Sequence, residues 1–131
     1  IERFQKAGFD IVYEFGRKAP TGPMKLDELG AVIHSVAECG IDHVIVEQSE
    51  IDMLGNTSAT GLQDLREQNW FDRIVIEADP YRFPTQHAEL VNTFGRDVNL
   101  CNIAPGQVLR LEGFRQGIGR AVGYNIMDGL I

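Results

Sequence analysis

The sequence predicts an α/β fold in which four parallel strands alternate with helices. Four short runs, rich in apolar residues, have the length of strands: "DIVYEF" (residues 10–15), "HVIVE" (43–47), "RIVIEA" (73–78) and "DVNLCNI" (97–103). Helical signals fill the segments between them. Strands joined by such short crossovers pair in parallel, which leaves two architectures open: a doubly wound sheet or part of a β/α barrel.

The first half of the chain supplies a loop, a helix and a longer loop. Residues 16–23, "GRKAPTGP", are rich in Gly and Pro and predict a loop after the first strand. Apolar residues recur every three or four positions in residues 25–39, which predicts a helix that Gly40 ends. Residues 48–61, "QSEIDMLGNTSATG", predict a long polar loop, and residues 62–70 predict a short helix.

The second half predicts two more helices. Residues 84–94 begin with Pro in a first-turn position, and Gly95 follows as the stop. A last helix is expected in residues 105–117, where three apolar residues are spaced for one face: Val108, Leu111 and Phe114. No linker or low-complexity segment interrupts this order, so we expect one (βα)4 domain over residues 1–131.

Composition and charge narrow the classes of partner. The chain is 44% hydrophobic and 24% charged, and no apolar run approaches the ~20 residues of a membrane span, so we expect no membrane partner. A net charge of −7 without a basic run disfavours nucleic acid. Cys39 and Cys101 have no metal-ligand spacing and are expected to be reduced, which fits a cytoplasmic protein.

Polar residues stand at or near the C-terminal ends of the predicted strands: Glu14, Glu47, Glu77, Asn99 and Asn102. In both possible architectures, the doubly wound sheet and the β/α barrel, the functional residues lie at this edge of the sheet. A carboxylate at the end of a buried strand is costly unless it is paired, hydrogen-bonded or bound to a cation, so three in equivalent places indicate a shared polar site. The alternative is that each Glu meets solvent or a local Arg. Oxygen ligands of this kind suit Mg²⁺.

Basic residues near these ends can bind a small anion. After the first strand, Gly16 lets the backbone turn closely, and Arg17 and Lys18 bring positive charge beside Glu14. The alternative for Lys18 is a solvated loop side chain. Two more arginines flank the glycine-bearing segment "RQGIGR": Arg115 and Arg120. Among the histidines, His87 in the helix after Glu77 is the one that can approach the site.

Five stretches, taken together, carry a family resemblance: "AGFDIVYEFGRKAP", "AECGIDHVIVEQSE", "RIVIEAD" with the following Gln86, "FGRDVNLCNI" and "LEGFRQGIG". They resemble phosphosulfolactate synthase, a β/α-barrel enzyme that adds sulfite to phosphoenolpyruvate with Mg²⁺ on the route to coenzyme M. The resemblance maps to strands five to eight, which implies a TIM-barrel type fold of which this chain is the second half, a fragment of a complete (β/α)8 domain. A homo-oligomer or a missing N-terminal half would then complete the barrel.

The resemblance also implies a reaction and roles for residues. Sulfite attacks the methylene carbon of phosphoenolpyruvate, and a proton then goes to the carbon that bears the phosphate. Lys18 matches the family's proton donor, with Glu14 beside it in the catalytic site, and Glu47 and Glu77 are the expected Mg²⁺ ligands. The expected substrate-binding residues are Arg17, Gln86, Asn99, Asn102, Arg115 and Arg120.

Departures from the family pattern keep other readings open. The family's "RESG" is "SEID" here, so its Arg is Ser49, its "RGDT" is replaced by "GRAV", and "DPYRFP" is an enlarged loop after Glu77. Candidates to replace the lost anion contact are Arg17, Arg82 and Arg120. The alternatives are a diverged barrel homologue that acts on another phosphorylated carboxylate or is inactive, and a half-barrel subunit whose role is assembly.

Overall fold

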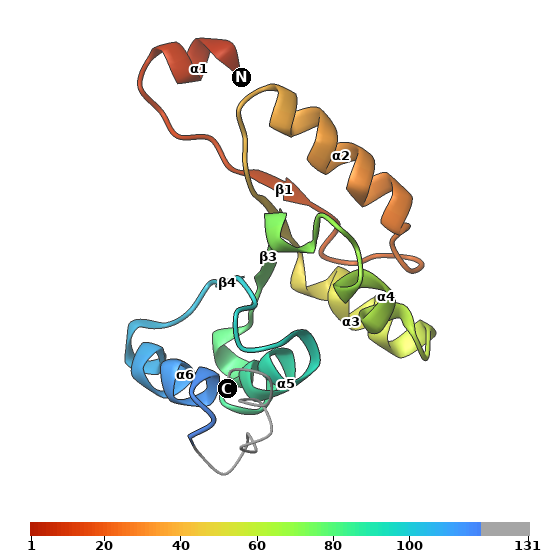
Figure 1. Cartoon of the computed structure of the whole chain (residues 1–131), viewed down its shortest axis with the longest axis vertical. Helices are drawn as coiled ribbons and strands as arrows, with labels where there is room; N and C mark the ends of the chain where they lie inside the picture. Colours follow the sequence, from red (N-terminus) through yellow and green to blue (C-terminus); the bar gives the residue numbers. More distant parts are fainter. Residues whose placement is uncertain (119–131) are drawn as a thin grey trace. The chain divides into compact units, whose positions relative to one another are not determined.

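The computed structural model describes residues 1–118 of the chain, in which strands and helices alternate (Figure 1). The strands are β1 (Tyr13–Phe15), β2 (Val44–Val46), β3 (Ile74–Glu77) and β4 (Leu100–Cys101). The α-helices are α1 (Glu2–Lys6), α2 (Leu26–Glu38), α3 (Gln48–Thr57), α4 (Gly61–Arg66), α5 (Thr85–Phe94) and α6 (Val108–Arg115). Short 3-10 helices are η1 (Phe71–Arg73), η2 (Pro80–Arg82) and η3 (Pro105–Gln107).

The strands form one sheet in the order β1-β2-β3-β4, which is also their order in the chain. β1 pairs with β2 in parallel, and β2 pairs with β3 in parallel, so that Phe15, Val46 and Ile76 lie level with one another. Sequential parallel strands joined by helical crossovers are the arrangement of part of a β/α barrel. The predicted fold class, four parallel strands alternating with helices, is therefore confirmed.

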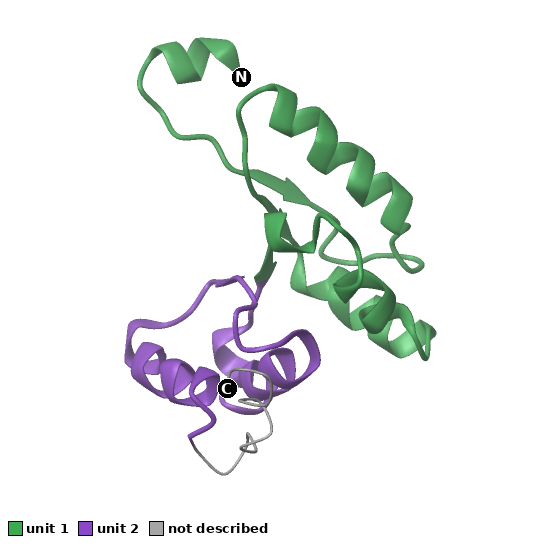
Figure 2. Cartoon of the chain, in the orientation of Figure 1, with its two compact units in different colours: residues 1–76 green, residues 77–131 purple. Residues whose placement is uncertain are grey.

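The chain divides into two compact units, residues 1–76 and residues 77–131 (Figure 2). The boundary falls inside β3, between Ile76 and Glu77. The assignment of residues 1–131 to a single half-barrel domain stays a prediction.

The first unit has a core built from alternating strand residues and one face of α2. Val44 and Val46 of β2 are buried while Ile45 between them is half-buried, and β3 repeats this pattern. The α2 residues Leu29, Ile33 and Val36, at three- and four-residue steps, are buried as well. Full burial of one such side chain stabilises the fold by about 1.5–3 kcal/mol.

The second unit has a core between α5 and α6, which contact each other. Leu111 and Phe114 of α6 are buried together with most of α5. Phe83, just before α5, stacks on Phe114 with ring centroids 6.0 Å apart, and Arg110 lies over the same Phe83 ring at 4.9 Å. Stacking and cation–π contacts of this kind fix the loop that precedes α5 onto α6.

One prediction about the fold is wrong. Residues 48–61, expected as a long polar loop, begin with a ten-residue helix, α3. Ile51 and Leu54, three residues apart, are buried, and α3 contacts α4, so burial of this short apolar stripe outweighs the loop-like composition. The neighbouring helix is shorter than predicted, since α4 ends at Arg66. None of the helices within residues 1–118 combines the length and the apolar character that a membrane span needs.

We predict that Leu29→Ala lowers the free energy of unfolding by about 2–5 kcal/mol, because Leu29 is fully buried on α2 and its truncation leaves a cavity. Ser35→Ala, at an exposed position of the same helix, is the matched control and should change stability by less than about 0.5 kcal/mol. Urea titrations of the three proteins measure both values. Equal stability of Leu29→Ala and the parent would contradict this description of the core.

Candidate functional site

The loop that leaves β1 turns sharply at Gly16. Gly16 has a φ of +117°, which side-chain-bearing residues rarely adopt. A Cβ atom at this position would lie 2.5 Å from Glu50 Cγ and 3.0 Å from Glu47 Cβ. The chain therefore passes close to the start of α3, and only glycine fits there.

Two side chains from the first turn of α3 hold the next residue of this loop. The Arg17 amide N–H donates a hydrogen bond to Glu50 Oε1 at 2.9 Å, and the Ser49 hydroxyl donates to the Arg17 carbonyl oxygen. Glu50 is only 6% exposed. Both backbone polar groups of Arg17 are thus fixed by the helix that follows β2.

Glu14 and Glu47 share one face of the sheet. Glu14 pairs in register with Ile45, and Glu47 follows Ile45 by two residues. Because side chains alternate along a strand, both carboxylates point to the same face. They differ in burial, since Glu14 is exposed and Glu47 is 5% exposed at the N-cap of α3.

Lys18 is exposed on the same loop, immediately after the residue that α3 holds. The loop also borders a hollow of about 300 Å³, lined by Arg17, Thr21, Glu28 and Glu50 among others. The first unit thus brings Glu14, Arg17 and Lys18 into one strand-to-loop segment. The predicted roles in this segment, catalysis by Glu14 and Lys18 and anion binding by Arg17, stay predictions.

In the second unit, the structure brings Glu77 and Asn102 together. Glu77 is the last residue of β3, and Asn102 follows β4 directly. The Asn102 amide nitrogen lies 3.5 Å from Glu77 Oε1 and donates to the Ala78 carbonyl at 3.1 Å. Asn102 has a φ of +60°, a conformation that Asn tolerates better than most residues. The amide at the end of the last strand therefore orients the carboxylate at the end of the neighbouring one.

Gln86 is buried and shapes the loop after β3. Its side-chain oxygen accepts the Asp79 amide N–H at 2.7 Å, and Gln107 donates to the Pro80 carbonyl at 2.9 Å. The Asp79 carboxylate accepts the Tyr81 amide N–H, and the Tyr81 residue is 98% exposed. The predicted substrate contact by Gln86 stays a prediction, and its observed partner is the backbone of this loop.

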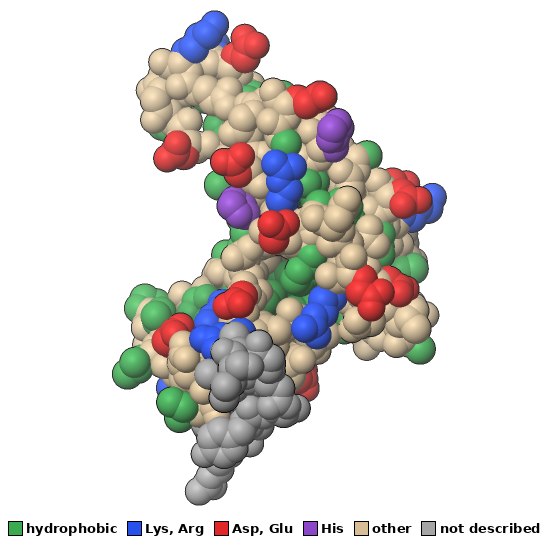
Figure 3. Space-filling model, viewed as in Figure 1, with side chains coloured by type: hydrophobic (Ala, Val, Ile, Leu, Met, Phe, Trp, Pro, Cys, Tyr) green, Lys and Arg blue, Asp and Glu red, His purple; other side chains and the backbone are tan. Residues whose placement is uncertain are grey.

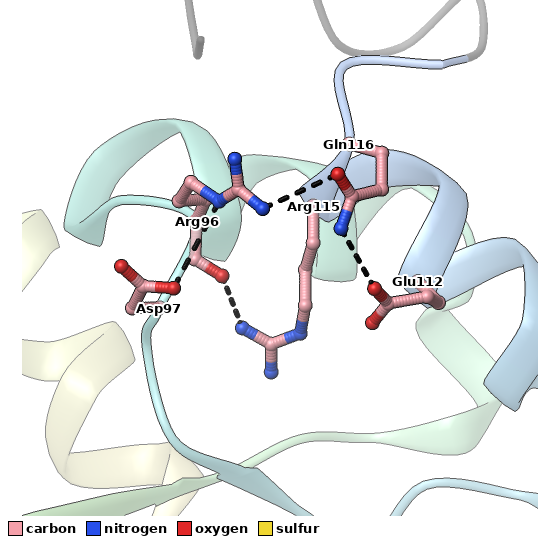
Figure 4. A network of polar contacts seen from close by, with 5 residues as sticks. All are labelled: Arg96, Asp97, Glu112, Arg115 and Gln116. Atoms are coloured by element: carbon pink, nitrogen blue, oxygen red, sulfur yellow. Dashed lines mark hydrogen bonds and ion pairs between the residues drawn. The ribbon is translucent and has the colours of Figure 1, made fainter. Parts of the chain in front are cut away.

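A separate polar network joins Arg96 and Asp97, which precede β4, to residues at the end of α6: Glu112, Arg115 and Gln116 (Figure 4). Arg115 donates to the Arg96 carbonyl, Arg96 Nη2 donates to Gln116 Oε1 at 3.2 Å, and Gln116 Nε2 donates to Glu112 at 2.9 Å. Asn99 and Arg115 border the same hollow of about 280 Å³. These two predicted substrate-binding residues are thus brought together at the start of β4, whereas Asn102 lies after its end.

Arg115 is partly buried in this network. Burial lowers the pKa of its guanidinium, and the nearby carboxylates of Glu112 and Asp97 oppose that shift. An arginine that donates to a backbone carbonyl and is flanked by two acids keeps its charge and braces the α5–β4 connection. The predicted phosphate contact at Arg120 lies outside the described residues.

His87 is fully buried on α5. Its ring lies edge-on to Phe83, with centroids 4.9 Å apart, and neither ring nitrogen has a hydrogen-bond partner among residues 1–118. Desolvation lowers the pKa of His87, and the Asp79 carboxylate opposes this shift. Burial therefore favours the neutral imidazole.

Sequence reasoning missed Ser49 and Glu50. Both belong to the stretch that was expected to be loop, and their partner Arg17 is more than 30 residues away in the chain. Recognition of the helix would have placed Glu50 in its first turn, where an acidic residue is favoured. Figure 3 shows that Lys and Arg side chains lie apart from one another on the visible face, among Asp and Glu.

Comparison with known proteins gives a consistent result. The sequence model of the family described as (2R)-phospho-3-sulfolactate synthase (ComA) matches residues 1–120. The chain is 30% identical to the phosphosulfolactate synthase of Methanocaldococcus jannaschii and 29% identical to that of Methanothermobacter thermautotrophicus, over 90% of this chain in each case. These matches cover 49% and 48% of the two relatives, so the chain spans about half of their length. No solved structure matches the chain significantly.

We predict that buried His87 makes the fold less stable in acid. Because its pKa is lowered from 6.5 by folding, the unfolded chain binds the proton more readily. The free energy of unfolding should therefore fall as the pH drops below 6.5, by at most about 1.4 kcal/mol per pH unit from this group, and level off below the lowered pKa.

Urea titrations at pH 7.5 and pH 5.5 measure this effect. His87→Leu should lose part of the difference between the two pH values, and His34→Gln, at an exposed position of α2, is the matched control. A His87→Leu protein with the same pH dependence as the parent would show that His87 does not cause it.

Proposed function

Because the chain belongs to the (2R)-phospho-3-sulfolactate synthase family, we propose that it forms about half of a lyase that adds sulfite to phosphoenolpyruvate and yields phosphosulfolactate. The observation that carries this proposal is the family match over residues 1–120, which includes all four strands and the loops that follow them. The local geometry supports it, since a cationic loop follows β1 and an oriented carboxylate–amide pair follows β3 and β4.

The proposed reaction joins two anions. The sulfur lone pair of sulfite forms a bond to the methylene carbon of phosphoenolpyruvate, and the electrons of the carbon–carbon double bond move toward the carboxylate. A proton then adds to the carbon that bears the phosphate. A chain with a net charge of −7 must supply positive charge locally for such substrates, and Arg17 and Lys18 are placed to do so.

Lys18 is the proposed proton donor. It is exposed on the loop after β1, where the ammonium can reach a bound molecule, and Glu14 lies on the strand that leads into this loop. Arg17 is the proposed contact to a phosphate or sulfite oxygen, because a guanidinium binds such oxyanions through two parallel hydrogen bonds. Glu14 is the proposed carboxylate partner of Lys18 in the catalytic site.

We propose that the family's Mg²⁺ binds at the carboxylates at the strand ends. Within residues 1–118, no group of three or more His, Cys, Asp and Glu side chains is arranged for a metal ion. Mg²⁺ often takes only one or two carboxylates and completes its shell with water and substrate oxygens. Glu47 in the first unit and Glu77 in the second each stay proposed ligands. When bound, Mg²⁺ would stabilise negative charge on the substrate carboxylate.

The second unit supplies the proposed neutral contacts. Asn102 orients Glu77 and offers an amide at the end of β4, and Gln86 holds the loop that begins at Asp79. Asn99 and Arg115 stay proposed substrate contacts as well, and Arg115 reaches the Arg96 carbonyl within the described structure.

A role in assembly is favoured by a separate observation. β1 is an edge strand of the sheet, and Val12 and Tyr13 beside that edge are 62% and 39% exposed. Unpaired strand edges with apolar side chains are sites for pairing with another chain. We propose that a second copy or an N-terminal half of the barrel covers this edge, and the mass of the protein in solution tests this.

The activity is tested by incubation of the full, assembled protein with phosphoenolpyruvate, sulfite and Mg²⁺. Phosphorus NMR and mass spectrometry should detect the sulfite adduct, and none should form when sulfite is omitted. A protein that leaves phosphoenolpyruvate unchanged under these conditions, but converts another phosphorylated carboxylate, would support the diverged-homologue alternative instead.

We predict that Lys18→Met lowers turnover by ~10² to 10⁴, the range typical of losing a general acid, and changes KM for phosphoenolpyruvate much less. Lys25→Met is the matched control, because Lys25 is also exposed and its described ion pair is with Glu28 at the start of α2. Steady-state kinetics of the three proteins measure both parameters. Near-normal turnover of Lys18→Met would exclude it as the proton donor.

A further inference from the structure

The backbone at the start of the β1–α2 loop is held by side chains of α3. Exposed loops rich in Gly and Pro are commonly mobile, because water satisfies their backbone groups. Here the two peptide planes that flank Arg17 are both bound by α3. Glu50 accepts the N–H of the plane between Gly16 and Arg17, and Ser49 donates to the carbonyl of the plane between Arg17 and Lys18.

The start of α3 explains why Glu50 is free to make this contact. Glu50 is the third residue of the helix, the position from which a Glu side chain often caps the N–H of the N-cap residue. The N-cap residue here is Glu47, and its N–H already donates to the Phe15 carbonyl at 3.0 Å, which continues the pairing of β2 with β1. The Glu50 carboxylate therefore turns to the neighbouring loop and binds the Arg17 amide.

Close packing reinforces this contact. The absence of a side chain at Gly16 is what lets the loop approach Glu50 Cγ and Glu47 Cβ. Glu50 is nearly buried, so its carboxylate has lost most of its water and gains from a backbone donor. The dipole of α3 also favours a negative charge in its first turn.

We propose that Glu50, assisted by Ser49, is a positioning residue that sets the direction in which Lys18 leaves the loop. The carbonyl of Arg17 and the amide nitrogen of Lys18 belong to one peptide plane, so a hydrogen bond to that carbonyl fixes the backbone from which the Lys18 side chain projects. The consequence for catalysis rests on the proposed role of Lys18 as proton donor. The arrangement of the backbone does not depend on that role.

The experiment compares Glu50→Ala, which removes the acceptor, with Glu50→Gln, which keeps an oxygen at the same reach. Amide hydrogen exchange by NMR reports the Arg17 N–H, and steady-state kinetics with phosphoenolpyruvate and sulfite report kcat and KM. Glu28→Ala is the matched control, because Glu28 borders the same hollow and its described ion pair is with Lys25.

In Glu50→Ala, exchange at the Arg17 amide should rise by at least ~10-fold as the loop opens locally. The value of kcat should fall by ~10 to 10²-fold, with KM for phosphoenolpyruvate nearly unchanged, because a misplaced proton donor slows the chemical step. Glu50→Gln should restore most of both values, and Glu28→Ala should match the parent. Ser49→Ala, which removes one hydroxyl, should also raise exchange at the Arg17 amide and lower kcat. It replaces Glu50→Ala as the test variant if Glu50→Ala does not fold.

Two results would overturn the proposal: unchanged exchange at Arg17 in Glu50→Ala and Ser49→Ala, or an equal loss of kcat in Glu50→Gln and Glu50→Ala. The second would give the Glu50 carboxylate a direct chemical role. If the parent protein forms no sulfite adduct, the proposed function fails, while the exchange data still decide whether Glu50 holds the loop.

Discussion

The parallel pairing of β1 with β2 is the constraint on which the candidate site depends. Phe15 and Val46 lie level in this pairing, and the Glu47 N–H continues it by donating to the Phe15 carbonyl. Since α3 begins directly after Glu47, its first turn must lie beside the loop that leaves β1. Ser49 and Glu50 can contact Arg17 because the first turn of α3 lies beside this loop.

This arrangement gives an acidic chain a cationic loop at a defined place. The charges of Arg17 and Lys18 belong to exposed side chains, but the backbone from which they project is held by a buried carboxylate and a hydroxyl. Backbone hydrogen bonds leave the basic side chains available for an anion, whereas a direct ion pair with Glu50 would neutralise one of them. In the second unit, a single amide side chain makes two contacts. Asn102, directly after β4, donates to the Ala78 carbonyl and also orients Glu77.

The sequence predicted the strands and helix α2 because each shows a pattern within a few consecutive residues. The strands are short apolar runs, and α2 has apolar residues at three- and four-residue steps. The prediction failed at α3, where only a short apolar stripe, Ile51 and Leu54, marks a helix whose other residues are polar. The strand-end acids were visible from spacing alone. The role of Glu50 was not, because it depends on a partner that the fold brings close from 33 residues away.

We propose that the anionic substrate binds at the loop after β1. Titration of the isotope-labelled protein with phosphoenolpyruvate, followed by NMR through the backbone amide signals, measures this binding residue by residue. We expect the signals of Gly16, Arg17 and Lys18 to shift in a saturable manner, and Arg17→Gln to weaken the response. Saturable shifts that leave these three residues unmoved, with the changes confined to other parts of the chain, would contradict it.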